Sequence, residues 1–349
     1  MLKFIIFLNI IVTMMFSLII ISFIPLILSS LLTFYLVKKW IKIAHENGFV
    51  GKDMNKYNKP EVAELGGLYV VLSIVFSLLF YIALKVYILK TVENLSYIFA
   101  ITTILLLSAL IGLLDDVLGW KKGLKHYKKV LITFILALPL MILGVGKDYI
   151  INIPFIGQIK LGLLYTLVLV PIGIVGAANA VNMIAGYNGL EASMLLVLFT
   201  GLFIESYRLG LLYISYISLL VIFSLIAFLY FNKYPAKVFP GNVFTYGLGG
   251  LYGALIILGN METFGLKNFV LYFLELLLFI RGLKDGIYKE NFGIPKEDNS
   301  LDEPYKKIYS VTHLAIRLNK KLFGKATENK VVLTIVIMQI IITIIALLT

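Results

Sequence analysis

The stretch ALIGLLDDVLGWKKGLKHYKK, residues 109–129, decides how the rest of the chain is interpreted. It opens as the end of a long apolar segment, continues with the adjacent carboxylates Asp115 and Asp116, and closes in a run of lysines. A carboxylate at the centre of a bilayer costs roughly 2.5–3.5 kcal/mol on insertion scales, so we expect this pair at the membrane–water boundary. Paired carboxylates beside a cationic patch suit a phosphorylated molecule presented with a metal ion. A helix end that faces solvent explains the stretch equally well.

The composition places the chain in a membrane. Of its 349 residues, 60% are hydrophobic and only 14% are charged. Apolar runs of 18 or more residues recur, each long enough to cross a hydrocarbon core of about 30 Å. We therefore predict an all-α polytopic membrane protein, a single integral membrane domain over residues 1–349. The absence of cysteine excludes a disulfide framework, a thiolate metal site and a thiol nucleophile.

About ten transmembrane helices are predicted. They fall at roughly 18–37, 66–88, 96–114, 128–145, 161–181, 189–206, 210–231, 243–260, 264–282 and 331–348. The first is interpreted as a retained span rather than a signal peptide, because its apolar run continues to about Val37 and no small-residue cleavage site closes it.

Lysine and arginine are distributed unevenly between the loops. Of the 31 such residues, 24 lie in loops that follow odd-numbered spans, and 7 lie elsewhere. Since positive residues concentrate in cytosolic loops, we predict that these basic loops are cytosolic and that both termini are external. If residues 1–37 formed a hairpin, the N-terminus alone would change sides. The formal charge of +12 is then a sign of membrane orientation and not of nucleic-acid binding.

Two segments between the spans are predicted to be structured. Residues 146–160 contain alternating β-branched residues around Pro154 and Gly157, which favours a small external β-hairpin. Segment 281–330 is predicted to be a long cytosolic loop. Within it, residues 309–323 repeat apolar side chains at helical spacing with Lys and Arg between them, which indicates an amphipathic helix on the cytosolic membrane surface.

Three residues inside the predicted spans carry further hypotheses. Gly249 and Gly253 are spaced for close packing against another helix. Glu275 is an intramembrane carboxylate, which is a functional candidate by default. Snorkelling over one turn, or a buried hydrogen bond, explains Glu275 at least as well.

The unusual polar residues gather on the side predicted to be cytosolic. They occur in residues 51–67, 115–129, 179–191, 238–242 and 281–330. Asn179 and Asn182 are three apart and share a helix face, close to Gly186 and Gly189. Asparagine amides can read a nucleobase edge or donate an oxygen to a hard cation, and glycines let the backbone approach a ligand. A capped, hydrogen-bonded turn is the alternative.

These stretches also resemble a known family. LLDDVLGWKK (113–122), NAVNMIAGYNGLEA (179–192) and VFPGN (238–242) followed by FTYGLGG (244–250) are similar to the signature stretches of polyprenyl-phosphate N-acetylhexosamine-1-phosphate transferases. GKDMNK (51–56), Pro60-Glu61 and TENKVVLTIVIMQII (327–341) are most similar to the eukaryotic and archaeal branch, the UDP-GlcNAc:dolichyl-phosphate GlcNAc-1-phosphotransferases. The bacterial branch typically has a His-rich motif in its last cytosolic loop, where this chain offers only His313.

The resemblance implies ten transmembrane helices with cytosolic active-site loops. It implies transfer of a sugar 1-phosphate, GlcNAc-1-phosphate being favoured, from a UDP-sugar to a polyprenyl or dolichyl phosphate. UMP is released, in the first membrane step of glycan assembly. The implied cofactor is Mg²⁺, with Mn²⁺ as an alternative. The expected partners are the UDP-sugar and the lipid phosphate in the membrane, without nucleic acid, and homodimer formation is left open.

Individual roles follow from the resemblance by position. Asp115 and Asp116 match the catalytic pair, and Lys125 matches the phosphate-binding lysine. Asn182 matches a metal ligand, and Asn242 stands where related members commonly carry a metal-binding Asp. The other candidate substrate-binding residues are Asn179, Gly186, Asn188 and Glu61, for uridine or its surroundings, and His313 and Arg317, for sugar or pyrophosphate.

Two other functions remain open at this point. One is a catalytically weak family member that binds lipid or nucleotide sugar, which the Asn at position 242 favours. The other, less favoured, is a secondary transporter. Transporters place polar, broken segments near the bilayer midplane, often in two related halves, whereas here the polar segments lie at one face and no repeat is visible.

Overall fold

The computed structural model describes residues 2–118, 134–146, 150–153 and 157–349. The helices of 13 or more residues are α1 (Leu2–Glu46), α2 (Gly66–Tyr87), α3 (Leu95–Leu118), α6 (Val170–Met183), α7 (Leu190–Arg208), α8 (Leu212–Asn232), α9 (Asn242–Leu258), α11 (Val270–Lys284), α12 (Val311–Phe323) and α13 (Glu328–Leu348). Shorter helical elements are η1 (Phe134–Ala137), α5 (Leu138–Ile142), η2 (Tyr165–Leu169) and α10 (Glu262–Asn268).

The described helices make this an integral, multi-pass membrane protein. Seven are long and apolar enough to cross a membrane, and α10 with α11 forms an eighth candidate span, bent by 57°. α9 is a shorter apolar helix of 17 residues. η1 and α5 fall in the predicted span 128–145, of which residues 128–133 lie outside the described part. A mostly helical fold is therefore confirmed, and the count of ten stays a prediction.

The C-terminal ends of α1 and α3 lie well beyond the predicted ones. α1, expected to leave the membrane near Val37, continues to Glu46. Its added turns carry exposed lysines, and lysine side chains are long enough to reach water from the end of a membrane helix. α3 continues to Leu118, so Asp115 and Asp116 lie inside its final turns and not in the loop beyond.

α9 is the central helix, and every residue from Val243 to Ile257 is buried. Two of its glycines, Gly249 and Gly253, face α6. A Cβ added at Gly253 would lie 2.8 Å from the Ala177 Cβ, and one at Gly249 would lie 2.9 Å from the Ala177 carbonyl oxygen. The predicted close packing at these two glycines is confirmed, and it brings the end of α6 against α9.

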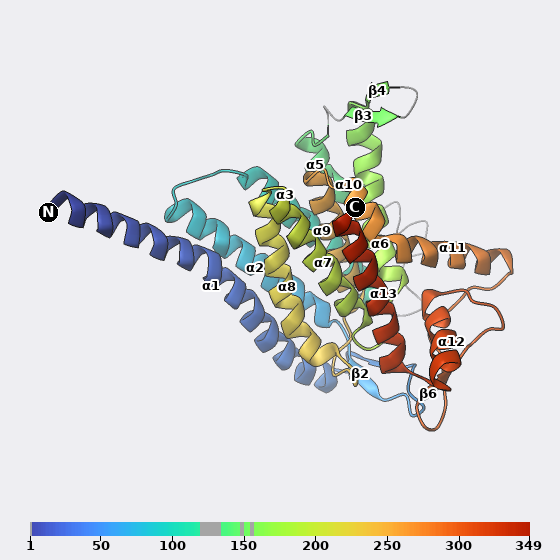
Figure 1. The fold of residues 1–349 in the computed structure, drawn as a ribbon. Coiled ribbons are helices and arrows are strands. Elements are labelled where there is room, and N and C mark those ends of the chain that lie inside the picture. Colours follow the sequence, from blue (N-terminus) through green and yellow to red (C-terminus); the bar gives the residue numbers. More distant parts are fainter. Residues whose placement is uncertain (1, 119–133, 147–149, 154–156) are drawn as a thin grey trace.

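The short strands mark the two ends of the helical bundle. β3 (Ile150–Ile153) and β4 (Gly157–Lys160) form an antiparallel hairpin, which confirms the hairpin predicted within 146–160. The opposite end carries the pair β1 (Val50–Lys52) and β2 (Glu61–Ala63) and the sheet of β5 (Ile294–Pro295), β6 (Ser300–Asp302) and β7 (Ala326–Thr327). Figure 1 shows the β3–β4 hairpin and the C-terminus at one end, and β2, β6 and α12 at the other.

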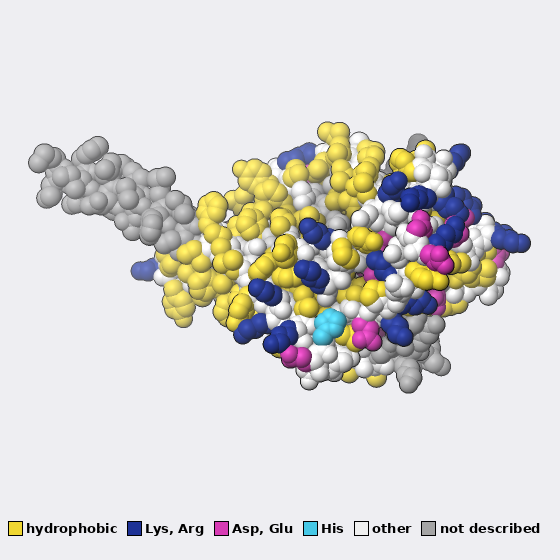
Figure 2. Space-filling view, turned by 90° about the horizontal axis from the view of Figure 1, so that it is seen from below, with side chains coloured by type: hydrophobic (Ala, Val, Ile, Leu, Met, Phe, Trp, Pro, Cys, Tyr) yellow, Lys and Arg dark blue, Asp and Glu magenta, His cyan; other side chains and the backbone are white. Residues whose placement is uncertain are grey.

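α12 lies where helical periodicity predicts it. Ser310 caps its first turn by accepting a hydrogen bond from the Thr312 N–H, and Gly324, at φ 74°, ends it in a left-handed conformation. Its position on a membrane surface stays a prediction. Seen from this end of the molecule, lysine and arginine side chains are spread widely and acidic ones are fewer (Figure 2).

Candidate active site

Asp115 and Asp116, near the C-terminus of α3, lie against the N-terminus of α9. Asp116 accepts hydrogen bonds from the backbone N–H groups of Asn242 (2.8 Å) and Val243 (2.9 Å). The first N–H groups of a helix have no partner within it, and that end carries a partial positive charge. Asp116 therefore caps α9, and this contact holds α3 and α9 together at the site.

Asn242 bridges the two carboxylates. Its side-chain Nδ2 donates to Asp115 Oδ2 at 2.7 Å, while its backbone donates to Asp116. The preceding Gly241 has φ 73°, and a Cβ there would lie 2.7 Å from Asp116 Oδ2. Both the backbone conformation and the available space thus require glycine before Asn242.

The end of α6 forms the third side of this cluster. Thr245 donates its hydroxyl to Asn182 Oδ1 at 3.0 Å, and Tyr246 donates its hydroxyl to Asn179 Oδ1 at 3.2 Å. Asn179 also donates Nδ2 to the Val175 carbonyl of its own helix. The three-residue spacing puts both asparagines on the face that meets α9.

The cluster offers the ligand atoms that a hard divalent cation prefers. Carboxylate oxygens come from Asp115 and Asp116, and an amide oxygen comes from Asn182. Asn242 can present its amide oxygen after a half-turn of the side chain. Within the described residues, no group of three or more His, Cys, Asp or Glu side chains could form an all-protein cage. The donor set fits a cation that also takes water and substrate phosphate oxygens as ligands.

Residues 184–189, between α6 and α7, form a loop beside the cluster. Gly186 has φ 121°, a conformation that favours glycine. Its N–H donates to Glu191 Oε1 at 2.9 Å, and its carbonyl accepts from Asn55 Nδ2 at 2.9 Å. A Cβ at Gly186 would lie 3.0 Å from the Phe292 ring. The loop backbone is therefore held by side chains from two other segments.

Asn188 is the most connected residue of this loop. Its backbone N–H donates to Glu328 Oε1 at 2.7 Å, and its Nδ2 donates to Asp53 Oδ2 at 3.0 Å. Its Oδ1 accepts from the Ala236 N–H at 2.6 Å. The residue is only 4% exposed, so these contacts fix its position within the protein.

Asn291 holds the other half of the same loop. Its Nδ2 donates to the carbonyls of Met183 (2.9 Å) and Ala185 (2.7 Å). The Tyr187 hydroxyl in turn donates to the Asn291 carbonyl at 3.1 Å. Burial raises the pKa of Tyr187 well above its ordinary value, so this hydroxyl stays protonated and able to donate.

Glu275 of α11 is fully buried and paired. It contacts the Lys289 ammonium and accepts hydrogen bonds from the Val311 N–H (2.7 Å) and the Ser310 hydroxyl (3.0 Å). The sequence allowed a functional role, snorkelling or a buried hydrogen bond for this carboxylate. The structure shows that it is buried, paired with a cation and hydrogen-bonded. Glu275 thereby connects α11 to the start of α12.

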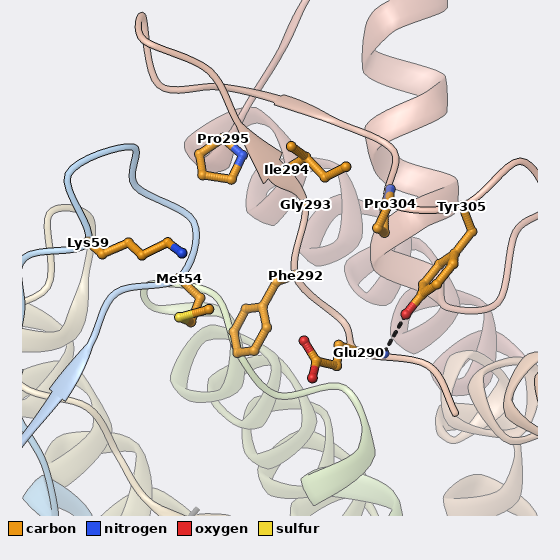
Figure 3. Close-up of a pocket in the computed structure, with 9 residues that line it drawn as sticks. All are labelled: Met54, Lys59, Glu290, Phe292, Gly293, Ile294, Pro295, Pro304 and Tyr305. Atoms are coloured by element: carbon orange, nitrogen blue, oxygen red, sulfur yellow. Dashed lines mark hydrogen bonds between the residues drawn. The ribbon is translucent and has the colours of Figure 1, made fainter. Parts of the chain in front are cut away.

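A cavity of about 260 Å³ lies between the loop before β2 and the segment leading to α12 (Figure 3). It is lined by Met54, Lys59, Glu290, Phe292, Gly293, Ile294, Pro295, Pro304 and Tyr305. The Glu290 N–H donates to the Tyr305 hydroxyl at 3.2 Å. Because Phe292 also lies against Gly186, this cavity adjoins the 184–189 loop.

His313 and Arg317 lie on α12, behind the cavity wall. The His313 ring is 5.4 Å from the Tyr305 ring, and its Nε2 lies 3.0 Å from the Glu290 carbonyl oxygen. Burial lowers the pKa of His313 to about 4, so the ring is neutral at pH 7. Arg317 donates to Glu303 (3.4 Å) and to the Lys306 carbonyl (2.9 Å).

Two predicted site residues remain, Glu61 and Lys125. Glu61 lies on β2 opposite Lys52, with its side chain exposed. Lys125 lies outside the described residues. The structure thus brings together Asp115, Asp116, Asn179, Asn182 and Asn242, and it sets Gly186 and Asn188 in the adjoining loop.

Several residues that build this site were not singled out from the sequence. Thr245 and Tyr246 orient the α6 asparagines, and Asp53, Asn291 and Glu328 hold the 184–189 loop. Asp53 and Glu328 do occur in the GKDMNK and TENK motifs. Their positions in these motifs could have marked them as candidate site residues. Their contact with Asn188 could not be predicted, because Asn188 is more than 130 residues from each.

Comparison with known proteins gives a consistent result. The model of glycosyl transferase family 4 matches residues 97–260. A protein of Saccharolobus solfataricus with the provisional name UDP-N-acetylglucosamine–dolichyl-phosphate N-acetylglucosaminephosphotransferase is 34% identical over 335 residues, 92% of this chain and 94% of its own. A protein of the same provisional name from Sulfolobus acidocaldarius is 32% identical over 314 residues, 88% and 90% of the two chains. A provisionally named glycosyltransferase of Methanocaldococcus jannaschii is 31% identical over 240 residues, 68% and 66%.

Fold and site together define a polytopic membrane protein with an oxygen-rich polar cluster at one end of its helices. The chain belongs to glycosyl transferase family 4, the polyprenyl-phosphate N-acetylhexosamine-1-phosphate transferases. The family resemblance seen in the sequence is confirmed. The chain is a transferase that moves a sugar 1-phosphate to a polyprenyl phosphate.

Proposed function

We propose that this protein transfers GlcNAc 1-phosphate from UDP-GlcNAc to dolichyl phosphate and releases UMP. The names of two archaeal relatives, each aligned over at least 88% of this chain, support this donor and this acceptor. The observation that carries the proposal is the meeting of Asp115, Asp116, Asn182 and Asn242, from α3, α6 and α9, in one polar cluster.

The chemistry needs one phosphorus–oxygen bond to form and one to break. An oxygen of the lipid phosphate attacks the sugar-bearing phosphorus of the UDP-sugar, and the bond to the UMP phosphate breaks. A phosphate monoester has a second pKa near 6, so the acceptor is largely dianionic at pH 7 and needs little proton abstraction. Asp115 or Asp116 orients the acceptor, removes its remaining proton, or attacks first as a nucleophile.

The proposed cofactor is Mg²⁺, with Mn²⁺ as an alternative. When bound, such a cation neutralises the phosphate charges and polarises the reacting phosphorus centre. Asp115, Asp116 and Asn182 would hold it, and Asn242 would contribute its amide oxygen. Lys125 is proposed to bind phosphate oxygens as a point charge.

The rest of the donor is proposed to bind beside this cluster. The 184–189 loop, with Gly186 and Asn188, is proposed to receive the uridine, together with Asn179 and Glu61. The cavity in front of His313 and Arg317 is proposed to receive the sugar or pyrophosphate. Its position next to Phe292, which lies against Gly186, supports this arrangement.

The active site is proposed to face the cytosol, at the end of a ten-span bundle. The basic loops predicted to be cytosolic include those that carry β2 and α12, which lie at the same end of the bundle (Figure 1). The residues just after β2 lie close to Asp115, since Gly67 donates to the Pro240 carbonyl and Asn242 donates to Asp115.

The test is release of UMP by purified protein in liposomes that contain dolichyl phosphate and Mg²⁺. UDP-GlcNAc should yield UMP, and UDP-glucose, which lacks the acetamido group, should yield far less. UDP-GlcNAc binding without UMP release would favour a catalytically weak binding member of the family. Accumulation of intact UDP-GlcNAc inside the liposomes would favour a transporter.

A further inference from the structure

A buried ion-pair network lies beside the proposed donor site but outside the Asp115–Asp116 cluster. The Lys56 ammonium contacts Glu328 Oε2 and lies 3.1 Å from Asp53 Oδ2. It also lies 4.2 Å from the centre of the Tyr234 ring. Asp53, Lys56, Asn188 and Glu328 are each at most 7% exposed, and we call these four residues the latch.

The latch joins segments that are far apart in the chain. Asp53 and Lys56 belong to the turn between β1 and β2, and Glu328 is the first residue of α13. Asn188 lies between them, bonded to Glu328 through its backbone and to Asp53 through its side chain. The last helix therefore contacts the 184–189 loop through Asn188.

A buried ion-pair network such as the latch contributes little to the free energy of unfolding. Taking an ion out of water costs several kcal/mol, and well-packed apolar residues of similar volume often do as well or better than a buried ion pair. The latch carboxylates instead make directed bonds, Glu328 to the Asn188 N–H and Asp53 to the Asn188 amide. Such bonds fix where the 184–189 backbone lies, which apolar packing does less strictly.

We propose that Lys56 and Glu328 are positioning residues for the nucleotide sugar. They hold Asn188, and with it the 184–189 loop, in the conformation that receives the donor. The start of α13 thus sets the affinity for UDP-GlcNAc without touching the reacting atoms. This inference rests on the proposed function, since it takes the 184–189 loop as part of the donor site.

The first test compares two substitutions at Glu328. Glu328→Ala removes the acceptor of the Asn188 N–H, and it should raise the KM for UDP-GlcNAc about tenfold or more. Glu328→Gln keeps an acceptor oxygen at this position, so its KM for UDP-GlcNAc should stay close to that of the parent protein. The kcat and the KM for dolichyl phosphate should change little in both variants, because the Asp115–Asp116 cluster is untouched.

The second test uses the charge balance of the latch. Lys56→Met leaves Asp53 and Glu328 buried without their shared cation, so it should raise the KM for UDP-GlcNAc strongly. Lys56→Met combined with Glu328→Gln removes one of those charges and should be less impaired than Lys56→Met alone. This comparison still decides the question if Glu328→Ala does not fold.

The matched control is a Lys–Glu pair on the surface of α1. Lys42 and Glu46 lie 3.7 Å apart with side chains 81% and 57% exposed, so Lys42→Met and Glu46→Ala should leave all three kinetic constants unchanged. Folded latch variants with an unchanged KM for UDP-GlcNAc would overturn the inference, as would a fall in kcat alone. So would Glu328→Gln being as impaired as Glu328→Ala.

Calorimetric binding of UDP-GlcNAc separates this inference from the proposed function. If the parent protein binds UDP-GlcNAc but releases no UMP, the proposed reaction fails, and the same variants still test the latch through their dissociation constants. Weaker binding in Glu328→Ala, restored in Glu328→Gln, then supports the latch. Equal binding in all variants, or no binding by the parent, overturns it.

Discussion

The amide at position 242 lowers the negative charge of the proposed catalytic cluster, compared with an Asp at the same position. Asn242 donates Nδ2 to Asp115 at 2.7 Å. A carboxylate in its place would face Asp115 as a like charge, which is unfavourable unless a cation lies between the two. With asparagine the cluster holds together through its own hydrogen bonds, and it offers a cation one negative charge fewer.

Asn242→Asp should therefore make the site depend more on the metal and bind it more tightly. We expect half-maximal activity at a lower Mg²⁺ concentration than in the parent. We also expect a lower melting temperature in EDTA that Mg²⁺ restores. Titration of Mg²⁺ against UMP release in both forms is the measurement. An unchanged Mg²⁺ requirement would show that position 242 is not a ligand, and an inactive parent rescued by Asp would favour the catalytically weak alternative.

Asp115 and Asp116 are expected to be needed for turnover but not for folding. Asp115→Asn and Asp116→Asn should each lower turnover by orders of magnitude while the protein still folds. Asn keeps one acceptor oxygen at position 116 for the N-terminus of α9, so the expected loss of stability there is about 1 kcal/mol. Turnover and melting temperature are measured together, with Asp298→Asn, on an exposed loop, as the control. Near-normal turnover in both aspartate variants would refute the paired-carboxylate mechanism.

At the scale of elements, the site depends on how closely α6 approaches α9. Gly253 faces Ala177 of α6, where an added Cβ would lie 2.8 Å from the Ala177 Cβ. Asn179 and Asn182 follow within two turns on the same helix. A small displacement of α6 therefore moves two polar groups away from Thr245 and Tyr246.

Gly253→Ala tests this packing against a matched control on the same pair of helices. Overpacking typically costs 1–3 kcal/mol, so we expect about that loss of stability together with reduced turnover. Gly176 of α6 has no neighbouring atom within 4 Å of an added Cβ, so Gly176→Ala should be neutral or slightly stabilising. Thermal unfolding in detergent is the measurement. Equal stability of the two variants would show that α6 and α9 do not need the glycine.

Local patterns in the sequence predict the elements better than their ends and contacts. Helical spacing predicts the shared face of Asn179 and Asn182, because periodicity depends on neighbours in the chain. The end of α3 is different, because the partners of Asp116 there are backbone N–H groups of α9, more than 120 residues away. The surroundings of Asn188 likewise come from three distant segments, which one sequence does not reveal.

At the scale of the whole molecule, the two ends of the bundle are predicted to face opposite sides of the membrane. β6 and the C-terminus lie at opposite ends of the structure (Figure 1). An epitope tag inserted in residues 297–300, before β6, should therefore be cytosolic, and a tag after Thr349 should be external. Protease protection of sealed vesicles is the measurement, and finding both tags on the same side would contradict the proposed orientation.

In the proposed reaction, the sugar and its attached phosphate move together to the lipid. UDP-GlcNAc labelled with ³²P at the β-phosphate and with ³H in the sugar tests this directly, in liposomes that contain dolichyl phosphate and Mg²⁺. We expect both labels to enter the lipid fraction in equal amounts, matched by UMP in the aqueous fraction, and Asp115→Asn and Asp116→Asn to abolish this transfer. Transfer of ³H to the lipid while ³²P stays in water as UDP would contradict it.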